Sequence, residues 1–187
     1  MNQHNNESTL PEGEIDVQLV ETFEGYIIDE NFALASEGYE VNAWFRHDWK
    51  PLTEEDITQG LKLLAWSRTD LLKAIAGLDL EQLERRYPGE RWSIAGILGH
   101  VGGADWWYLD RLGLAFPRQQ VPEEPFARLA TIRGHLEKRL PELAGSQQVV
   151  GVDGEFWSPR KLLRRAVWHE RDHTEHIHKL LMLSGIR

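Results

Sequence analysis

Residues 158–181 read SPRKLLRRAVWHERDHTEHIHKLL, and this stretch decides the fold class. Ser158 followed by Pro159 indicates a helix start, because a serine hydroxyl can cap the first turn and proline already has the backbone angle that the first helical position needs. Alternate steps of four and three residues from Leu162 reach Ala166, His169, His173, His176 and Leu180. Residues at this spacing share one helix face. The stretch therefore predicts a long amphipathic helix whose buried stripe carries histidines.

Three further segments show helical spacing. Thr53, with an aspartate three positions later, begins a helix that runs to about Gly77, and Ser93 caps a second helix. A third helix begins after Pro125 and ends or kinks at Pro141. Four amphipathic helices bury their apolar faces most simply against one another. We therefore expect an all-α protein, with a four-helix bundle over residues 51–187.

The remaining segments predict small β elements. Val17 alternates with Leu19, and apolar side chains alternate again over residues 39–45, so residues 15–50 are expected to form a small β appendage. Two strands alone are marginal in water, and the appendage should therefore lean on the rest of the protein or on a second copy. The Asp-Gly pair at 153–154 lies between apolar residues, which indicates a short hairpin just before the last helix.

The composition narrows the functional classes. Cysteine is absent from the 187 residues, which excludes a disulfide framework and a thiolate metal site. The net charge of -9 has the wrong sign for binding nucleic acid or an anionic membrane. The uncharged stretch 93–104 is shorter than the roughly 20 residues that a membrane-spanning helix needs. Residues 1–14 lack the features of a secretory signal and are expected to form a disordered lead-in. We therefore expect a cytoplasmic protein that acts on a small molecule.

The histidines of the last helix have the spacing of metal ligands. His169 and His173 lie four positions apart, about 6 Å along a helix, so both rings can reach one cation. His100, in the apolar arc of the second helix, is the best candidate for a third ligand. His176 lies about 10.5 Å along the axis from His169 and is interpreted as a neighbour. Three neutral imidazoles would hold a divalent zinc, nickel, iron or manganese ion with an open position. The alternative is a set of core histidines that bond backbone carbonyls or carboxylates.

The same residues also spell H-E-x-x-H, which in zinc peptidases supplies two ligands, here His169 and His173, and a general base, here Glu170. The extended form of that motif needs glycine at 176 and histidine at 179, but the sequence has His176 and Lys179. A peptidase is therefore the lesser alternative.

Two segments together resemble a known family. GERWSIAGILGHVGGADWWYLDRL at 89–112 and RRAVWHERDHTEHIHKLL at 164–181 are similar to the DinB-like superfamily of metal-binding four-helix bundles, a resemblance that covers about residues 52–183. It implies that His100, His169 and His173 hold a divalent metal. It also implies frequent dimerisation, here a homodimer. Where a reaction is known, the resemblance implies metal-dependent transfer or isomerisation with low-molecular-weight thiols such as bacillithiol or mycothiol.

Other polar and aromatic residues could complete the site. Asp105 interrupts the apolar face of the second helix and Arg68 that of the first, so the two could form a buried ion pair, or Arg68 could receive an anionic substrate group. Glu170 or Asp105 could act as general base, and Asp105, Glu170 or Asp172 could orient a ligand ring. Trp107 and Trp168 are expected in the wall of a substrate pocket.

Two functions from different classes remain open. In the first, the metal lowers the pKa of a thiol or of water, and the resulting nucleophile attacks a small electrophile, as in a thiol S-transferase or a hydrolase. The sulfur would come from a low-molecular-weight thiol co-substrate, because the chain has no cysteine. In the second, the protein is a non-catalytic metal- or small-ligand-binding module of a stress response, with a closed metal site.

Overall fold

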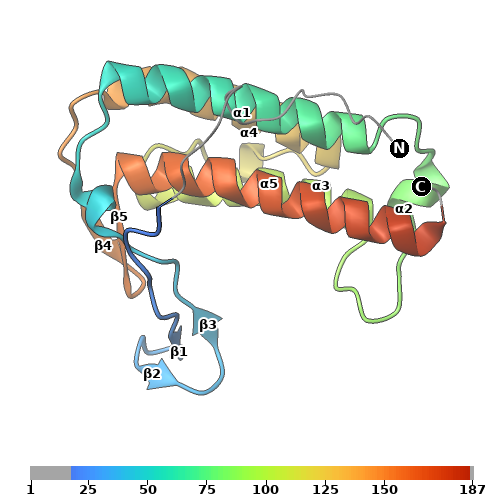
Figure 1. Ribbon diagram of the computed structural model, residues 1–187, viewed down its shortest axis with the longest axis horizontal. Helices are drawn as coiled ribbons and strands as arrows, with labels where there is room; N and C mark the ends of the chain where they lie inside the picture. The colour runs from blue at the N-terminus through green and yellow to red at the C-terminus, as the bar shows by residue number, and fades with distance from the viewer. Residues whose placement is uncertain (1–17, 186–187) are drawn as a thin grey trace.

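Four long helices form a bundle in the computed structural model, which describes residues 18–185 (Figure 1). They are α1 (Glu54–Ala74), α3 (Ile94–Arg111), α4 (Pro125–Arg139) and α5 (Pro159–Ser184). Helix α3 packs against both α4 and α5, and α5 packs against α1. The predicted all-α bundle is confirmed, and a short helix, α2 (Leu80–Glu84), which the sequence analysis did not identify, precedes α3.

The helices begin at the capping residues that the sequence indicates. The Thr53 hydroxyl accepts a hydrogen bond from the Asp56 backbone N–H, and the Asp56 carboxylate accepts one from the Thr53 N–H. Ser93 caps α3 and Ser158 caps α5 in the same manner, each accepting from a backbone N–H three residues later at 3.1 Å. These caps fix the positions along α3 and α5 at which their histidines emerge. Helix α1 ends at Ala74, one turn earlier than expected.

Two small antiparallel sheets complete the chain. The N-terminal sheet has the order β2-β1-β3, with β1 (Ile27–Ile28), β2 (Leu34–Ala35) and β3 (Tyr39–Glu40), and it lies at one end of the bundle (Figure 1). The predicted hairpin is present as β4 (Val150–Val152) and β5 (Glu155–Trp157), with the turn at residues 153–154. Three 3-10 turns, η1 (Arg46–Trp49), η2 (Arg118–Gln120) and η3 (Leu140–Leu143), lie in the connections.

The N-terminal strands differ from the expected ones. Leu19 lies outside any strand and is 84% exposed, while Val17 and the predicted lead-in 1–14 lie outside the described residues. Of residues 39–45, only Tyr39–Glu40 forms a strand. The Val41 N–H still donates to the Tyr26 carbonyl, but the pairing goes no further because the Asn42 N–H donates to the Glu155 carboxylate. A side chain of β5 thus replaces a sheet partner at this point.

Lys161, at the start of α5, holds this segment against the bundle. Its side chain is fully buried, and its ammonium donates to the carbonyls of Asn42 and Phe156 and to the Glu155 carboxylate. Arg164, one turn further, donates to the buried Asp48 carboxylate. A buried lysine is tolerated only when its charge is paired and its donors are satisfied. These contacts therefore bind residues 42–48 firmly to α5.

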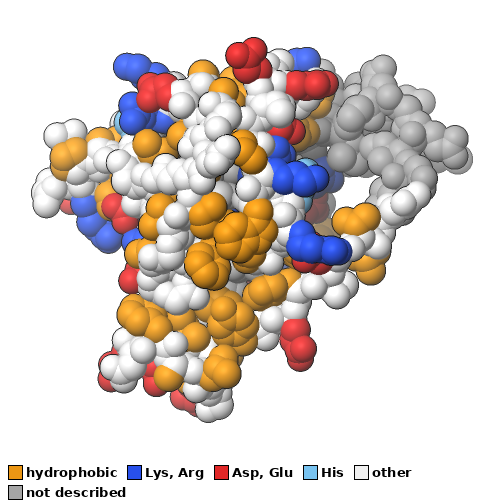
Figure 2. Space-filling model, turned by 90° about the vertical axis from the view of Figure 1, so that its left-hand side faces the viewer, with side chains coloured by type: hydrophobic (Ala, Val, Ile, Leu, Met, Phe, Trp, Pro, Cys, Tyr) orange, Lys and Arg blue, Asp and Glu red, His pale blue; other side chains and the backbone are white. Residues whose placement is uncertain are grey.

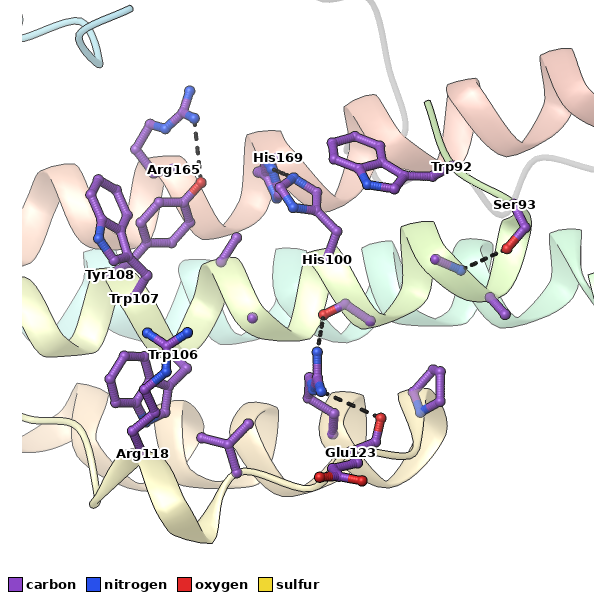
Figure 3. Close-up of a pocket in the computed structure, with 18 of the residues that line it drawn as sticks. Trp92, Ser93, His100, Trp106, Trp107, Tyr108, Arg118, Glu123, Arg165 and His169 are labelled. Atoms are coloured by element: carbon purple, nitrogen blue, oxygen red, sulfur yellow. Dashed lines mark hydrogen bonds between the residues drawn. The ribbon is translucent and has the colours of Figure 1, made fainter. Parts of the chain in front are cut away.

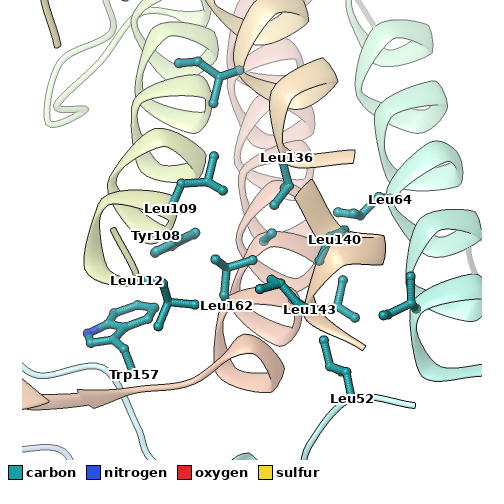
Figure 4. Packing of buried hydrophobic residues seen from close by; sticks show 14 residues of the cluster. Leu52, Leu64, Tyr108, Leu109, Leu112, Leu136, Leu140, Leu143, Trp157 and Leu162 are labelled. Carbon is teal, nitrogen blue, oxygen red and sulfur yellow. The ribbon is translucent and has the colours of Figure 1, made fainter. Parts of the chain in front are cut away.

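The core consists of two hydrophobic clusters with a polar layer between them. One cluster surrounds Trp157 and Leu162 at the hairpin end of the bundle (Figure 4), and the other surrounds Leu98 and Ile177. Each long helix contributes one buried or partly buried charged residue to the ion pairs of this layer. These residues are Arg68 of α1, Asp105 of α3, Arg133 of α4 and Glu170 of α5. The layer includes the level of the histidines on α5.

Hydrophobic side chains also reach the surface at the hairpin end, which Figure 2 shows. Trp49 and Phe156 are 53% and 51% exposed, and the rings of both pack against Trp44. Among the helices of the described residues, none has the combination of length and hydropathy that crossing a membrane requires.

Candidate metal centre

Three histidine side chains from two helices meet between α3 and α5. The Nε2 atom of His169 lies 3.1 Å from that of His100 and 3.2 Å from that of His173. One ligand atom from each of the three residues lies within 4.8 Å of the others. Figure 3 shows the rings of His100 and His169 facing each other across the gap between the helices. The structure thus brings together the three residues that the sequence predicts as ligands.

The spacing of these nitrogens fits a shared metal ion. Zinc binds imidazole nitrogen at about 2.0–2.1 Å, and the corners of a tetrahedron of that radius lie about 3.3 Å apart. The two Nε2 separations that involve His169, 3.1 and 3.2 Å, are close to this value, while the ligand atoms of the whole group lie within 4.8 Å of one another. A set of three imidazoles is also the donor set of catalytic zinc sites, in which the fourth position holds an exchangeable ligand.

Burial keeps these imidazoles in the form that binds metals. His169 and His173 are each 7% exposed. Burial, together with repulsion from the neighbouring histidines, lowers the pKa of His169 to about 2 and that of His173 to about 4. Burial also lowers the pKa of His100. Neutral imidazoles at pH 7 are ready to donate their lone pairs to a cation.

Aromatic rings surround the histidine rings. Trp92 stacks on His100 with the ring centres 4.4 Å apart, and its ring also meets the edge of His173. Tyr108 meets His169 at 5.9 Å. Within residues 18–185, the buried Nδ1 atoms of His169 and His173 have no hydrogen-bond partner. The expected carboxylate that orients a ligand ring is therefore absent from the described part of the chain, and aromatic packing positions the rings instead.

Glu170 and Asp105 occupy a different place from the one predicted. Glu170 is fully buried, and its two carboxylate oxygens accept hydrogen bonds from Arg68, at 2.5 Å, and from Arg133. Arg133 also donates twice to Asp105, at 3.0 and 3.2 Å. The predicted ion pair between Arg68 and Asp105 is therefore not formed. Instead, four residues form a network in which Arg133 bonds both carboxylates, those of Asp105 and Glu170.

This network corrects three expectations. Neither Glu170 nor Asp105 lines the cavity beside the histidines, so the structure does not place a general base there from this pair. Arg68 does not line it either, because its guanidinium is bonded to Glu170 and to the Leu129 carbonyl. An H-E-x-x-H peptidase needs its glutamate beside the metal-bound water. Because both oxygens of Glu170 are engaged by arginines, the peptidase interpretation loses its base.

A cavity of about 980 Å³ opens beside His100 and His169. Its wall includes Trp107, as predicted, together with Trp92, Trp106, Tyr108, Arg128 and Arg165 (Figure 3). Trp168 lies outside this wall, because its indole is half exposed and packs against the Arg165 guanidinium. His176 bonds Glu90 at 2.9 Å, which agrees with its interpretation as a neighbour. A volume of this size accommodates a small organic molecule.

Comparisons with known proteins agree with this arrangement. The sequence profile described as "DinB superfamily" matches residues 63–177, which is more than half of the chain. The chain belongs to the DinB superfamily. No curated protein matches it. Among solved structures it is similar to YfiT from Bacillus subtilis, described as "a probable metal-dependent hydrolase with an unusual four-helix bundle topology", with a TM-score of 0.56 and 19% identity. That likeness covers 74% of this chain and 94% of YfiT, and it shows the shared fold.

The centre of this DinB protein contains residues that the sequence analysis did not single out. Trp92 lies just before Ser93, the capping residue of α3, where the helix pattern does not predict which way a side chain points. In the structure its ring stacks on that of His100. Arg133 lies beside Ile132 on the buried face of α4, and one signal for it was available, since it is four residues after the buried Leu129. Arg165 was one of several basic residues at the start of α5, which usually indicate a solvated face.

Proposed function

We propose that this protein is a metal-dependent enzyme in which His100, His169 and His173 hold a divalent cation at the wall of a substrate cavity. The observation that carries the proposal is the convergence of three imidazoles, from the buried His169 and His173 and the partly buried His100, next to a cavity of about 980 Å³. A structural metal site is closed by four protein ligands, whereas a catalytic site keeps an exchangeable position. In the described residues the histidine group has three members, which favours the catalytic type.

When bound, the cation would lower the pKa of a coordinated thiol or water and so supply a nucleophile near neutral pH. The chain's own residues have simpler tasks. The three imidazoles stay neutral and positioned, Trp92 and Tyr108 pack against them, and aromatic side chains line part of the cavity. The proposed reaction is either transfer of a low-molecular-weight thiol to a small electrophile or hydrolysis of that electrophile by water.

The aromatic wall also supports the second candidate, a binding module without turnover. The Glu170 carboxylate, which follows His169 directly, is bonded to two arginines, and the cavity's own carboxylates, Glu40, Glu84 and Glu123, are at exposed positions. A site that only binds a ligand needs no general base. Turnover is therefore the property that separates the two candidates.

Metal analysis of the purified protein tests the proposal. The wild type should bind close to one equivalent of zinc or nickel after dialysis, and the variants His100→Ala, His169→Ala and His173→Ala should each lose it. His178→Ala is the matched control, because it removes an imidazole from the same helix outside the cluster. Equal metal content in all five proteins would refute the site.

A panel of thiols and small electrophiles then tests turnover with the metal-loaded wild type. Thiol transfer or hydrolysis that disappears in His169→Ala and survives in His178→Ala supports the enzyme. Stoichiometric metal without turnover across the panel supports the binding module.

A further inference from the structure

Arg165 lies one helical turn before His169, and both side chains line the same cavity. Residues four apart on a helix are neighbours on one face. The Arg165 Nη2 donates to the Tyr108 hydroxyl at 3.3 Å, as Figure 3 shows. The guanidinium carbon lies 4.7 Å from the centre of the Trp168 ring. These two contacts hold the guanidinium in place beside the histidine centre.

The Arg165 guanidinium keeps donors that no part of residues 18–185 uses. Its Nε is shielded from solvent and has no hydrogen-bond partner there. None of the carboxylates in these residues forms an ion pair with it, whereas Arg68, Arg133 and Arg164 are all paired with acids. An arginine stays charged at any physiological pH, and leaving a shielded donor without a partner is costly. Within residues 18–185 the charge of Arg165 therefore has no acidic partner.

The other charged side chains of the cavity do not pair with Arg165, and they differ from it in exposure or in hydrogen bonding. Those at exposed positions are Glu40, Glu84, Arg86, Arg118 and Glu123, while Arg128 and Arg165 are partly buried. Arg128 differs from Arg165, because each of its three nitrogens donates a hydrogen bond to a backbone carbonyl, those of Pro122, Gly99 and Glu123. Arg165 is therefore the partly buried cation of this wall with a nitrogen that has no hydrogen-bond partner in the described residues.

We propose that Arg165 binds the carboxylate of a small molecule whose other end reaches the histidine centre. This inference rests on the proposed function, since it concerns the same cavity. A planar guanidinium matches a carboxylate in shape and charge. One turn of helix separates Arg165 from His169 by about 6 Å along the axis, so a chain of a few carbon atoms links the two positions. The substrate class is a short carboxylic acid that carries a metal-binding group such as a thiol. Arg165 thus takes the anion-binding role that the sequence analysis considered for Arg68.

Two probes of equal length test the proposal, 3-mercaptopropionate and its neutral analogue 3-mercaptopropanol. Their affinities for the zinc-loaded protein are measured by titration calorimetry. The wild type should bind the acid at least about ten-fold more tightly than the alcohol, the usual effect of a charge-assisted hydrogen bond. In Arg165→Met the ratio of the two affinities should fall to about one while the affinity for the alcohol is unchanged. Arg165→Lys should keep part of the preference.

Arg118→Met is the control, because it removes a positive charge from an exposed position of the same cavity. It should leave the acid-to-alcohol ratio within about three-fold of the wild type. A wild-type ratio near one, or a preference for the acid that survives in Arg165→Met, would overturn the proposal. Metal content is measured on every sample. A wild type that binds no zinc refutes the proposed function and this inference with it, whereas a zinc-loaded protein that ignores the change at Arg165 refutes this inference alone.

Discussion

Replacing Glu170 by glutamine separates a structural role of this side chain from a catalytic one. The buried network contains two carboxylates and two guanidiniums, so its formal charge sums to zero. Glutamine has nearly the same volume and therefore creates no cavity, but it leaves one guanidinium charge uncompensated inside the bundle. Breaking a buried ion pair by removing one partner costs about 3–5 kcal/mol. Glu170 is fully buried, which places this case within that range.

Urea denaturation followed by circular dichroism measures this cost. With a slope of about 2 kcal/mol per molar urea, the midpoint should fall by about 1.5–2.5 M. The control is Glu175→Gln, which removes the same charge from an exposed position of the same helix and should change the stability by no more than about 0.5 kcal/mol. Below the transition, Glu170→Gln should still bind metal, because the glutamine oxygen can still accept a hydrogen bond from an arginine of this layer and the three histidines are unaltered. Equal midpoints for the two variants would refute the structural reasoning. An unchanged midpoint with lost turnover would return Glu170 to the role of general base.

Three further predictions concern packing, pH and the appendage. Gly60→Ala should destabilise the protein by about 1–3 kcal/mol in urea denaturation, because an added Cβ would lie 2.5 Å from a leucine side chain of α5. Gly134→Ala, whose added Cβ would meet nothing within 4 Å, should stabilise the protein by about 0.5–1 kcal/mol. Stability changes of the same sign in both variants would contradict the described packing. In the metal-free protein, His173 has a pKa of about 4 when folded, so between pH 6.5 and 4 the unfolded chain binds a proton at this residue that the folded chain does not. The free energy of unfolding should therefore fall as the pH falls, and it should fall less steeply in His173→Phe. Parallel pH profiles of stability for the two proteins would contradict this prediction. Lys161→Met should increase hydrogen exchange in residues 42–48 while α3 keeps its protection, and uniform loss of protection would show that the contact serves the whole fold.

The helices could be predicted from the sequence because their signals are local. A capping side chain acts within three residues, and an apolar stripe repeats within two turns, so Ser93 and Ser158 mark helix starts without any knowledge of the fold. The histidine centre was predictable for a related reason. His169 and His173 are positioned by one helix, and an apolar arc places His100 on the inner face of another.

The partners of buried charges could not be predicted in the same way. A stripe shows that Arg68 and Asp105 face inward, but their heights along different helices depend on how the helices pack. The structure pairs them with Glu170 and Arg133 instead of with each other. The extent of the N-terminal strands was predicted wrongly for a similar reason. The pairing of β3 stops where its backbone bonds a residue more than 110 positions away, Glu155.

The four-residue network also fixes how far each helix is displaced along its own axis. Sliding α5 by a single turn would move Glu170 about 5.4 Å, out of reach of Arg68 and Arg133, and would set its charge against leucines. Glu170 is the residue that immediately follows His169. The pairing that specifies helix alignment therefore also determines whether imidazoles from two helices arrive at the same height, and a repacked apolar version of this layer would be expected to fold while losing its affinity for the cation.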